Sequence, residues 1–175
     1  TIVVFMSDNG PNGNRYNGKL RGIKGSVHEG GVKVPFFMKW PGKIPVDIAL
    51  KTPVAHIDIY PTLQALCGLN LVGQKPIDGV NLSAMILDAK DDLSLDKRKI
   101  FTHVNFMKLP PEPSPGGFRF GNHRFVMEND EPGLYDLATD PEEKENIADI
   151  NRQLTDRYRA EYQEWFSNGI KKLSV

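Results

Sequence analysis

Two polar residues at the end of an apolar run are the first in this chain whose types could do chemistry. Asp8 and Asn9 follow the run Thr1–Met6 and precede Gly10. A carboxylate and an amide oxygen at the end of a rigid strand suit a divalent cation such as Ca²⁺ or Mg²⁺. Asn-Gly is also a turn pattern, but the next apolar run lies over twenty residues away, which argues against a tight hairpin. Two ligands do not complete a coordination shell, so the others would come from elsewhere.

A basic, glycine-rich stretch follows the polar pair. Arg21 and Lys24 stand among glycines in Leu20–Gly25, LRGIKG. Cationic side chains beside a metal would hold a tetrahedral oxyanion, either phosphate or sulfate, although a solvated basic loop is the other interpretation. His28 could donate a proton, contact a substrate or be a packed ring, and the last two are favoured because no partner is visible. Glu29 is expected to tie the loop together.

Strands must position these residues. The non-alternating run Ile2–Phe5 predicts a strand buried on both faces. Residues 7–31 contain seven glycines and are predicted to be mostly loop. Val32–Trp40 predicts a second strand, in an edge or irregular position because of Pro35. The chemistry is therefore expected where the chain leaves a sheet.

The middle of the chain predicts helices and a boundary. A helix is expected to begin at Asp58, whose side chain can cap free amides, and to end at Gly68. Cys67, the only cysteine, lies in an apolar helical pattern and is expected to be a buried small hydrophobe rather than a nucleophile. Leu82–Leu87 predicts a short helix, and the polar residues 88–98 predict a linker or domain boundary.

From Ile100 the pattern becomes that of a small α+β subdomain, an antiparallel sheet with one covering helix. A helix of about 17 residues with apolar positions every three or four residues is expected to end at Gly169. The predicted domains are residues 1–92 and 93–175. The predicted strands are Ile100–Phe106, Phe118–Phe120, Arg124–Glu128 and Gly133–Leu137, the middle two forming a hairpin around Gly121-Asn122.

Composition limits the classes of function. The 175 residues are 39% hydrophobic and 25% charged with a formal net charge of +0, which favours neither a nucleic acid nor an anionic membrane as a partner. No apolar run approaches the length of a membrane span. The single cysteine excludes an internal disulfide. Because the sequence begins inside a predicted buried strand, we expect it to be the C-terminal piece of a longer protein.

Several motifs together resemble a known family. SDNGP, LRGxKG, EGGVxVP and WPGKI occur in order and are followed by three more segments, to about residue 149. This order is similar to that of the sulfatases, the arylsulfatase branch of the alkaline phosphatase superfamily. The later segments are HIDIYPTL at 56–63, DGVNL at 78–82, and LYDL at 134–137 with Asp140-Pro141 and Glu145-Asn146, which resemble LYDL…DP.E..N.

The resemblance implies an α/β fold, the C-terminal part of an alkaline-phosphatase-like sandwich with the small α+β subdomain. It implies that Asp8 and Asn9 ligate Ca²⁺, with Mg²⁺ possible, and that Lys24 contacts the sulfate and is catalytic. Arg15, Arg21 and His28 are expected to bind substrate together with Lys24. Lys33 stands where the family usually has Arg. Lysine keeps the positive charge but lacks the planar guanidinium group, which can donate two parallel hydrogen bonds.

The expected reaction is hydrolysis of aryl or sugar sulfate esters by a formylglycine nucleophile. The family makes this group from a C/S-x-P-x-R motif, which is absent from these 175 residues. We therefore expect the nucleophile to come from the missing N-terminal part, and this chain alone to be inactive with weak or no Ca²⁺ affinity. The alternatives are a phosphodiesterase or phosphonate hydrolase of the same superfamily, or a non-catalytic substrate- or partner-binding module.

Partners follow from the same resemblance. They are a sulfated small molecule or glycan and the N-terminal part of the same protein, with no nucleic acid and no membrane. Self-association of this chain is also expected, because sheet edges would be exposed. Localisation stays open, with periplasmic, secreted or lysosomal settings implied by the family.

Overall fold

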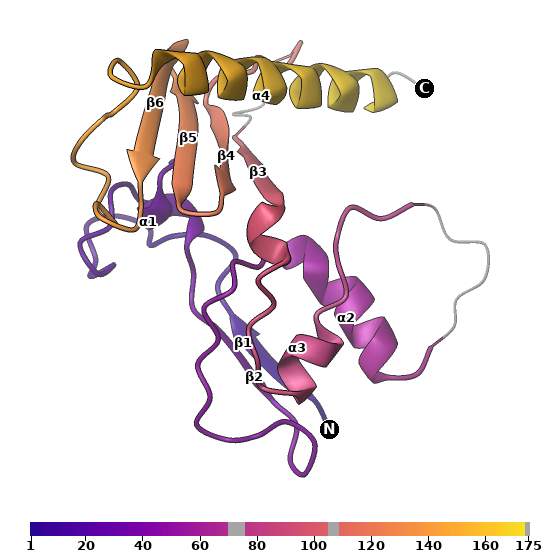
Figure 1. Ribbon diagram of the computed structural model, residues 1–175. Helices are drawn as coiled ribbons and strands as arrows, with labels where there is room; N and C mark the ends of the chain where they lie inside the picture. Colours follow the sequence, from indigo (N-terminus) through magenta and orange to yellow (C-terminus); the bar gives the residue numbers. More distant parts are fainter. Residues whose placement is uncertain (70–75, 105–108, 174–175) are drawn as a thin grey trace. The chain divides into compact units, whose positions relative to one another are not determined.

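The computed structural model describes residues 1–69, 76–104 and 109–173 (Figure 1). Two compact units divide it: unit 1 is residues 1–5 and 37–98, and unit 2 is residues 6–36 and 99–175. The predicted boundary between residues 92 and 93 differs from this division, because residues 6–36 group with the C-terminal part. The elements are, in order, β1 (Val3–Met6), α1 (Glu29–Val32), β2 (Phe36–Lys39), the 3₁₀ turn His56–Asp58, α2 (Ile59–Leu66), α3 (Ser83–Leu87), the 3₁₀ turn Leu95–Lys97, β3 (Lys99–His103), β4 (Gly116–Phe120), β5 (His123–Glu128), β6 (Glu131–Asp136) and α4 (Arg152–Leu173).

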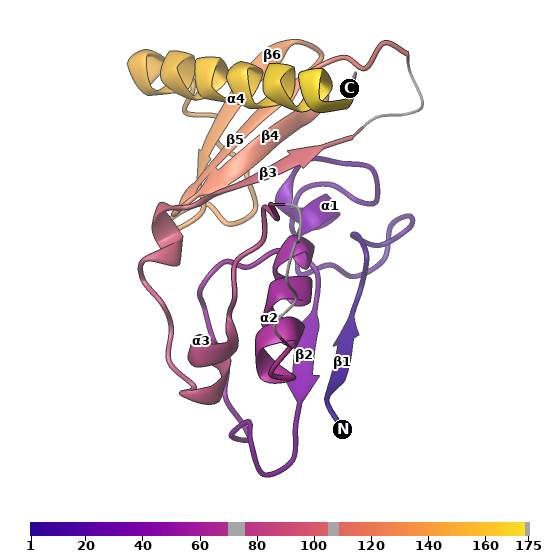
Figure 2. The same ribbon diagram turned by 90° about the vertical axis from the view of Figure 1, so that its right-hand side faces the viewer.

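Strands β1 and β2 lie side by side as a two-stranded sheet (Figure 2). The first predicted strand is confirmed as β1. Of the strand predicted over Val32–Trp40, only Phe36–Lys39 is a strand, because Val32 ends α1 and Pro35 interrupts the run. The predicted burial of both faces of β1 is wrong for the described chain: Val3 and Phe5 are 54% and 65% exposed, and Phe37 is 64% exposed. With two strands and no layer of described residues over these side chains, the apolar run stays accessible. The expected self-association of the chain stays a prediction.

Unit 1 has a small apolar core around α3. Leu82, Met85 and Ile86 are buried, and Met85 and Ile86 lie three and four residues after Leu82, on one face of the helix. The predicted short helix is therefore confirmed. Partly buried side chains from β2 and the loops complete the cluster: Met38, Ile44, Leu50, Val54, Val80 and Leu95.

Three local expectations fail. Asp58 precedes α2 but makes no side-chain hydrogen bond to the helix amides, because its carboxylate is used by the loops around it. Cys67 is exposed rather than buried. Gly169 does not end α4, which runs through it to Leu173. Gly68 does end α2, with a φ of 64° that favours glycine.

Unit 2 contains an antiparallel sheet of four strands in the order β3-β4-β5-β6. The predicted hairpin is confirmed: Phe120 pairs with His123 around Gly121-Asn122. The β5–β6 turn uses Asn129 and Asp130, both at positive φ, which matches the twist of the strands. Of the predicted strand Ile100–Phe106, residues 105–106 lie outside the described residues.

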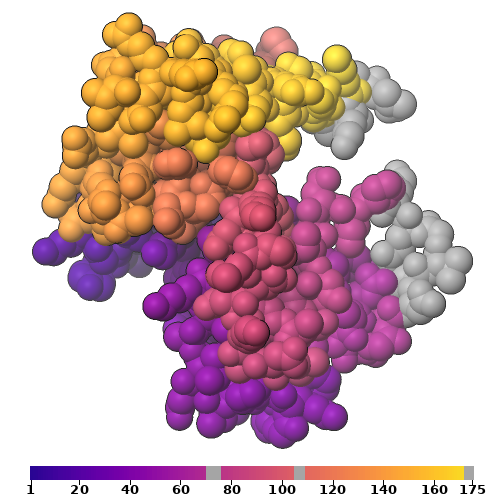
Figure 3. All heavy atoms as spheres, viewed as in Figure 1, coloured from indigo at the N-terminus to yellow at the C-terminus, as the bar shows by residue number. Residues whose placement is uncertain are grey.

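Helix α4 covers one face of this sheet, and its side chains pack over the strands (Figure 3). Tyr158 and Tyr162, one turn apart on α4, meet Phe118, Phe125 and Leu134 of the sheet, all at most 2% exposed. The aromatic rings make tilted and edge-on contacts, which stabilise such a core beyond the area they bury. The predicted sheet with one covering helix is thus confirmed. No helix in the described ranges combines the length and apolar character needed to cross a membrane.

Candidate functional site

The second face of the four-stranded sheet receives the glycine-rich segment, residues 6–36. Side chains alternate between the two faces of a strand, so the neighbours of Phe118, Phe125 and Leu134 point away from α4. These neighbours are Arg119, Arg124 and Tyr135, which lie opposite one another in the strand register. We call them the cross-strand row.

Each member of the cross-strand row holds a different part of the segment. Arg124 donates to the Val27 carbonyl through both Nε, at 3.0 Å, and a terminal nitrogen. Arg119 lies 3.4 Å from the Glu29 carboxylate. Arg21 donates to the Tyr135 hydroxyl at 2.7 Å. The sheet therefore anchors the segment at three points along its length.

The positive charges of Arg119 and Arg124 are offset by the carboxylates of Glu29 and Glu143. Arg119 and Arg124 are opposite one another, where like charges destabilise a pair of strands. Burial lowers the pKa of the Arg124 guanidinium, the neighbouring Arg119 lowers it further, and the carboxylates of Glu29 and Glu143 act against this shift. Burial also raises the pKa of the Tyr135 hydroxyl, which keeps it protonated, while Arg21 acts in the opposite direction.

Close glycine packing shapes the loop itself. Gly10 donates its amide to the Gly31 carbonyl at 2.8 Å, and a Cβ on Gly10 would lie 2.0 Å from the Gly30 oxygen. A Cβ on Gly30 would lie 2.2 Å from the Gly22 oxygen. Only residues without side chains allow the strand end, the basic loop and α1 to meet this closely.

This packing brings the predicted metal pair and the predicted sulfate contact into one loop cluster. The Lys24 amide donates to the Pro11 carbonyl at 3.0 Å, three residues after Asp8. The Ser7 hydroxyl donates to the Asn9 carbonyl at 2.8 Å and shapes the strand end. Asp8 and Lys24 are exposed, and Asn9 is half-buried. The arrangement leaves a carboxylate and an ammonium group facing solvent on neighbouring stretches of chain.

The residues at this position fit part of a Ca²⁺ site. A carboxylate and an amide oxygen are the hard ligands that Ca²⁺ takes, but it needs six to eight oxygens. In the part of the chain that the structure describes, no group of three or more His, Cys, Asp or Glu side chains could hold a metal ion. Asp8 and Asn9 would thus supply two ligands of a larger set.

The other predicted substrate residues separate into two environments. Arg15 is exposed on the outer part of the loop, beside Tyr16, which is 94% exposed. Asn17 holds the base of that loop through hydrogen bonds to the Leu20 and Gly22 carbonyls. Arg21 is also exposed, but its guanidinium is bonded to Tyr135, and His28 is 2% exposed.

Sequence reasoning missed the partners of His28 and Arg21. Glu143, 1% exposed, accepts a hydrogen bond from His28 Nδ1 at 2.9 Å, and Tyr135 holds Arg21. Tyr135 belongs to the LYDL segment of the closing motif, and Glu143 lies between its Asp140-Pro141 and Glu145-Asn146 segments. The motif was visible in the sequence, but nothing local indicated that it contacts a loop more than a hundred residues earlier. Asn146 of the motif accepts the Leu134 amide at 3.1 Å, a purely structural contact.

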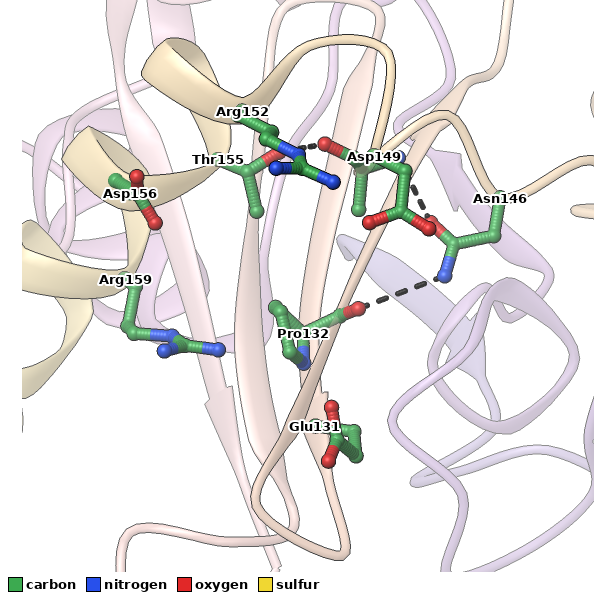
Figure 4. A pocket seen from close by; sticks show the side chains of 9 residues that line it. Glu131, Pro132, Asn146, Asp149, Arg152, Thr155, Asp156 and Arg159 are labelled. Atoms are coloured by element: carbon green, nitrogen blue, oxygen red, sulfur yellow. Dashed lines mark hydrogen bonds between the residues drawn. The ribbon is translucent and has the colours of Figure 1, made fainter.

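A pocket of about 390 Å³ lies elsewhere in unit 2, between α4 and the residues around β6 (Figure 4). None of the predicted site residues lines it. Its carboxylates, those of Glu131, Asp149 and Asp156, outnumber the guanidinium groups of Arg152 and Arg159. This charge balance does not favour an anion such as sulfate.

Comparisons with known proteins support the motif assignment. The family model named Sulfatase matches residues 1–69. A sulfatase from Formosa agariphila is 34% identical over an alignment of 158 positions, which covers 84% of this chain and 28% of that protein. A steryl-sulfatase from Rattus norvegicus is 30% identical over an alignment of 184 positions, which covers 82% of this chain and 31% of that protein.

A solved structure agrees in fold. The crystal structure of Ps i-CgsB in complex with k-i-k-neocarrahexaose superposes with a TM-score of 0.80 at 26% identity, covering 94% of this chain and 36% of that one. The alkaline-phosphatase-like α/β assignment is thereby confirmed. This chain spans about a third of the length of the proteins it matches.

Proposed function

We propose that this chain, which belongs to the sulfatase family, contributes Lys24 to one side of an active site that hydrolyses sulfate esters. Lys24 would contact the sulfate and stabilise the charge that develops on its oxygens. Asp8 and Asn9 would ligate Ca²⁺, or Mg²⁺ in its place. A bound divalent ion would polarise the sulfate oxygens. The observation that carries the proposal is the hydrogen bond from the Lys24 amide to the Pro11 carbonyl, which brings the basic loop beside the Asp8-Asn9 strand end.

The sequence contains no C/S-x-P-x-R motif, so a formylglycine would come from residues outside these 175. We infer that the 175-residue chain by itself does not turn over an aryl sulfate. Measurable turnover by this chain alone would contradict that inference.

Arg15 and Tyr16 support a sulfated saccharide or aryl sulfate as the substrate. An exposed aromatic ring can pack on the apolar face of a sugar or of an aryl group, and a neighbouring guanidinium can pair with an anionic substituent. Ps i-CgsB, with its bound neocarrahexaose, is a neighbour of the same fold that binds a saccharide. Both kinds of sulfate ester therefore belong in the assay.

The test is sulfate release by the intact protein that contains this chain. Lys24→Ala is expected to lower kcat by about 10²–10³-fold, because a group that stabilises developing charge is removed. Lys43→Ala, which removes an exposed lysine of unit 1, is the matched control and is expected to keep the wild-type rate. Addition of a Ca²⁺ chelator is expected to lower the rate as well.

Other outcomes identify the alternatives. Preferred turnover of a phosphodiester or phosphonate ester would replace the sulfatase proposal with the related hydrolase. Binding of a sulfated glycan without turnover of any ester would indicate a non-catalytic module. Equal activity of Lys24→Ala and Lys43→Ala would remove Lys24 from the site.

A further inference from the structure

The carboxylate of Glu143 joins the closing segment to the segment that contains Lys24. Its Oε1 accepts from His28 Nδ1 at 2.9 Å, and its Oε2 accepts from the Glu29 amide at 2.7 Å. We call these two hydrogen bonds the closing clamp. We propose that Glu143, together with His28 and Arg21, positions the Lys24 loop and that none of the three contacts the substrate. The inference rests on the function proposed for Lys24.

Both the side chain and the backbone of Arg21 make hydrogen bonds to other residues of unit 2. Its guanidinium donates to the Tyr135 hydroxyl at 2.7 Å and to the Glu143 carbonyl at 3.3 Å, and it lies 5.5 Å from the centroid of the Tyr135 ring. Its own carbonyl accepts the Gly30 amide at 2.7 Å. Although Arg21 is exposed, its guanidinium is held by a hydroxyl, a carbonyl and an aromatic ring, which makes it a structural tie.

His28 is enclosed. Its ring is 2% exposed and stands edge-on to Tyr135, with centroids 5.6 Å apart. Since the Glu143 carboxylate accepts, Nδ1 is the donor of the 2.9 Å bond. Nε2 lies 3.5 Å from the Glu128 carboxylate, longer than an ordinary hydrogen bond. A substrate would have to displace this packing to reach the ring.

Backbone hydrogen bonds between short stretches of chain connect the closing clamp to Lys24. The clamp holds residues 28 and 29, and the next two residues, Gly30 and Gly31, bond to the Arg21 carbonyl and the Gly10 amide. The residue after Gly10 accepts the Lys24 amide at 3.0 Å. Because the glycine contacts leave no room for a Cβ, a shift of residues 28 and 29 would be passed to Lys24 rather than absorbed.

The backbone of Glu143 supports a positioning role. Its φ is 55°, a left-handed conformation that costs free energy for a residue other than glycine. The surrounding contacts hold it there, since both carboxylate oxygens and the carbonyl are bonded to the segment. A glycine would adopt this conformation more easily but would have no clamp.

The test compares Glu143→Gln with Glu145→Gln in the intact protein. An amide keeps both clamp bonds only if the His28 ring changes tautomer, so that Nδ1 accepts from the new NH₂ group; in either case the charge-assisted hydrogen bonds are lost. We expect kcat to fall about 10–100-fold, as for residues that orient site groups, with KM changed less than about threefold. Glu145 is exposed in the same segment, and its substitution is expected to leave both constants unchanged. Glu143→Asp, which keeps the charge, is expected to restore part of kcat.

A second readout does not depend on activity. Hydrogen–deuterium exchange of peptides covering residues 20–31 is expected to rise in Glu143→Gln and to stay at wild-type values in Glu145→Gln. Tyr135→Phe is the milder second variant, because it keeps the ring and removes only the hydroxyl that Arg21 binds. It is expected to change kcat and exchange in the same direction by a smaller factor.

The outcomes separate this inference from the proposed function. If the wild-type intact protein hydrolyses no sulfate ester, the proposed function fails, and the exchange data still decide whether Glu143 holds the loop. If the wild type is active, unchanged exchange in Glu143→Gln, an unchanged kcat, or a rise in KM alone would overturn the positioning role. A raised exchange with a lowered kcat and steady KM supports it.

Discussion

At the scale of single residues, Asp58 shows how a buried carboxylate organises the loops of unit 1. It is fully buried and accepts from Arg98 through both oxygens, at 2.6 and 2.7 Å. The amides of Ala55 and Val80 donate to it at 2.8 and 2.9 Å. Burial by itself disfavours the charged form, but the hydrogen bonds from Arg98, Val80 and Ala55 outweigh it and lower the pKa of Asp58.

We expect Asp58→Asn to lower the free energy of unfolding by about 3–5 kcal/mol at neutral pH, because Arg98 loses its buried counter-ion. A lowered native pKa means that the unfolded state binds the proton first as pH falls, so stability is present above the unfolded-state value of about 4 and is lost below it. The gap between wild type and variant should therefore shrink in acid. Denaturant unfolding at neutral and acid pH measures this.

The exposed Asp88, at the end of α3, supplies the matched control. Asp88→Asn is expected to change stability by less than about 0.5 kcal/mol. An equal loss in both variants, or a gap that does not depend on pH, would contradict the role given to Asp58.

At the scale of elements, two glycines at helix positions differ in whether the backbone conformation requires a glycine. Gly169 lies inside α4 with open space where a Cβ would stand, so its missing side chain serves no contact. Gly68 also faces open space but has a φ of 64° at the end of α2. The same substitution should thus have opposite effects at the two positions.

Gly169→Ala is expected to raise the free energy of unfolding by about 0.5–1 kcal/mol, since alanine loses less conformational freedom in a helix. Gly68→Ala is expected to lower it by about 1 kcal/mol, because a Cβ is strained at positive φ. Thermal and denaturant unfolding of the two variants against wild type measure the signs. Stabilisation by both substitutions, or by neither, would refute the distinction.

At the scale of the whole molecule, the four-stranded sheet is covered on both faces by parts of the chain that are distant in sequence. Helix α4 covers one face, and residues 6–36 cover the other through Val27, Val126 and Tyr135 and the charges of the cross-strand row. Unit 2 therefore includes residues on both sides of unit 1 in the sequence. A sheet packed on one face alone would leave the buried guanidinium of Arg124 without its acceptor.

A chain of residues 93–175, the predicted C-terminal domain, is expected to lack a stable native sheet. It would expose Val126 and Tyr135, each of which contributes about 1.5–3 kcal/mol by burial. Fluorescent-dye binding and the cooperativity of urea unfolding measure this, with residues 6–36 linked to 99–175 as the control. Cooperative unfolding of 93–175 without dye binding would show that residues 6–36 are dispensable for the sheet.

The sequence by itself determined the elements whose patterns are local. Alternation and turn residues predicted the β4–β5 hairpin, and the repeat of Leu154, Tyr158 and Tyr162 predicted α4, because the period of the apolar residues is set by the geometry of the element they form. The ordered motifs also identified the family, and they pointed to Asp8, Asn9 and Lys24 as the residues to follow.

Only the tertiary structure decided which of the basic loop's residues are tied to distant parts of the chain. His28 and Arg21 look like Lys24 in the sequence, all polar residues among glycines. Their difference comes from Glu143 and Tyr135, more than a hundred residues away. Contacts at that separation leave no trace in local periodicity, because they depend on how the sheet brings distant segments together. The same reason explains why the covering of the second sheet face escaped prediction.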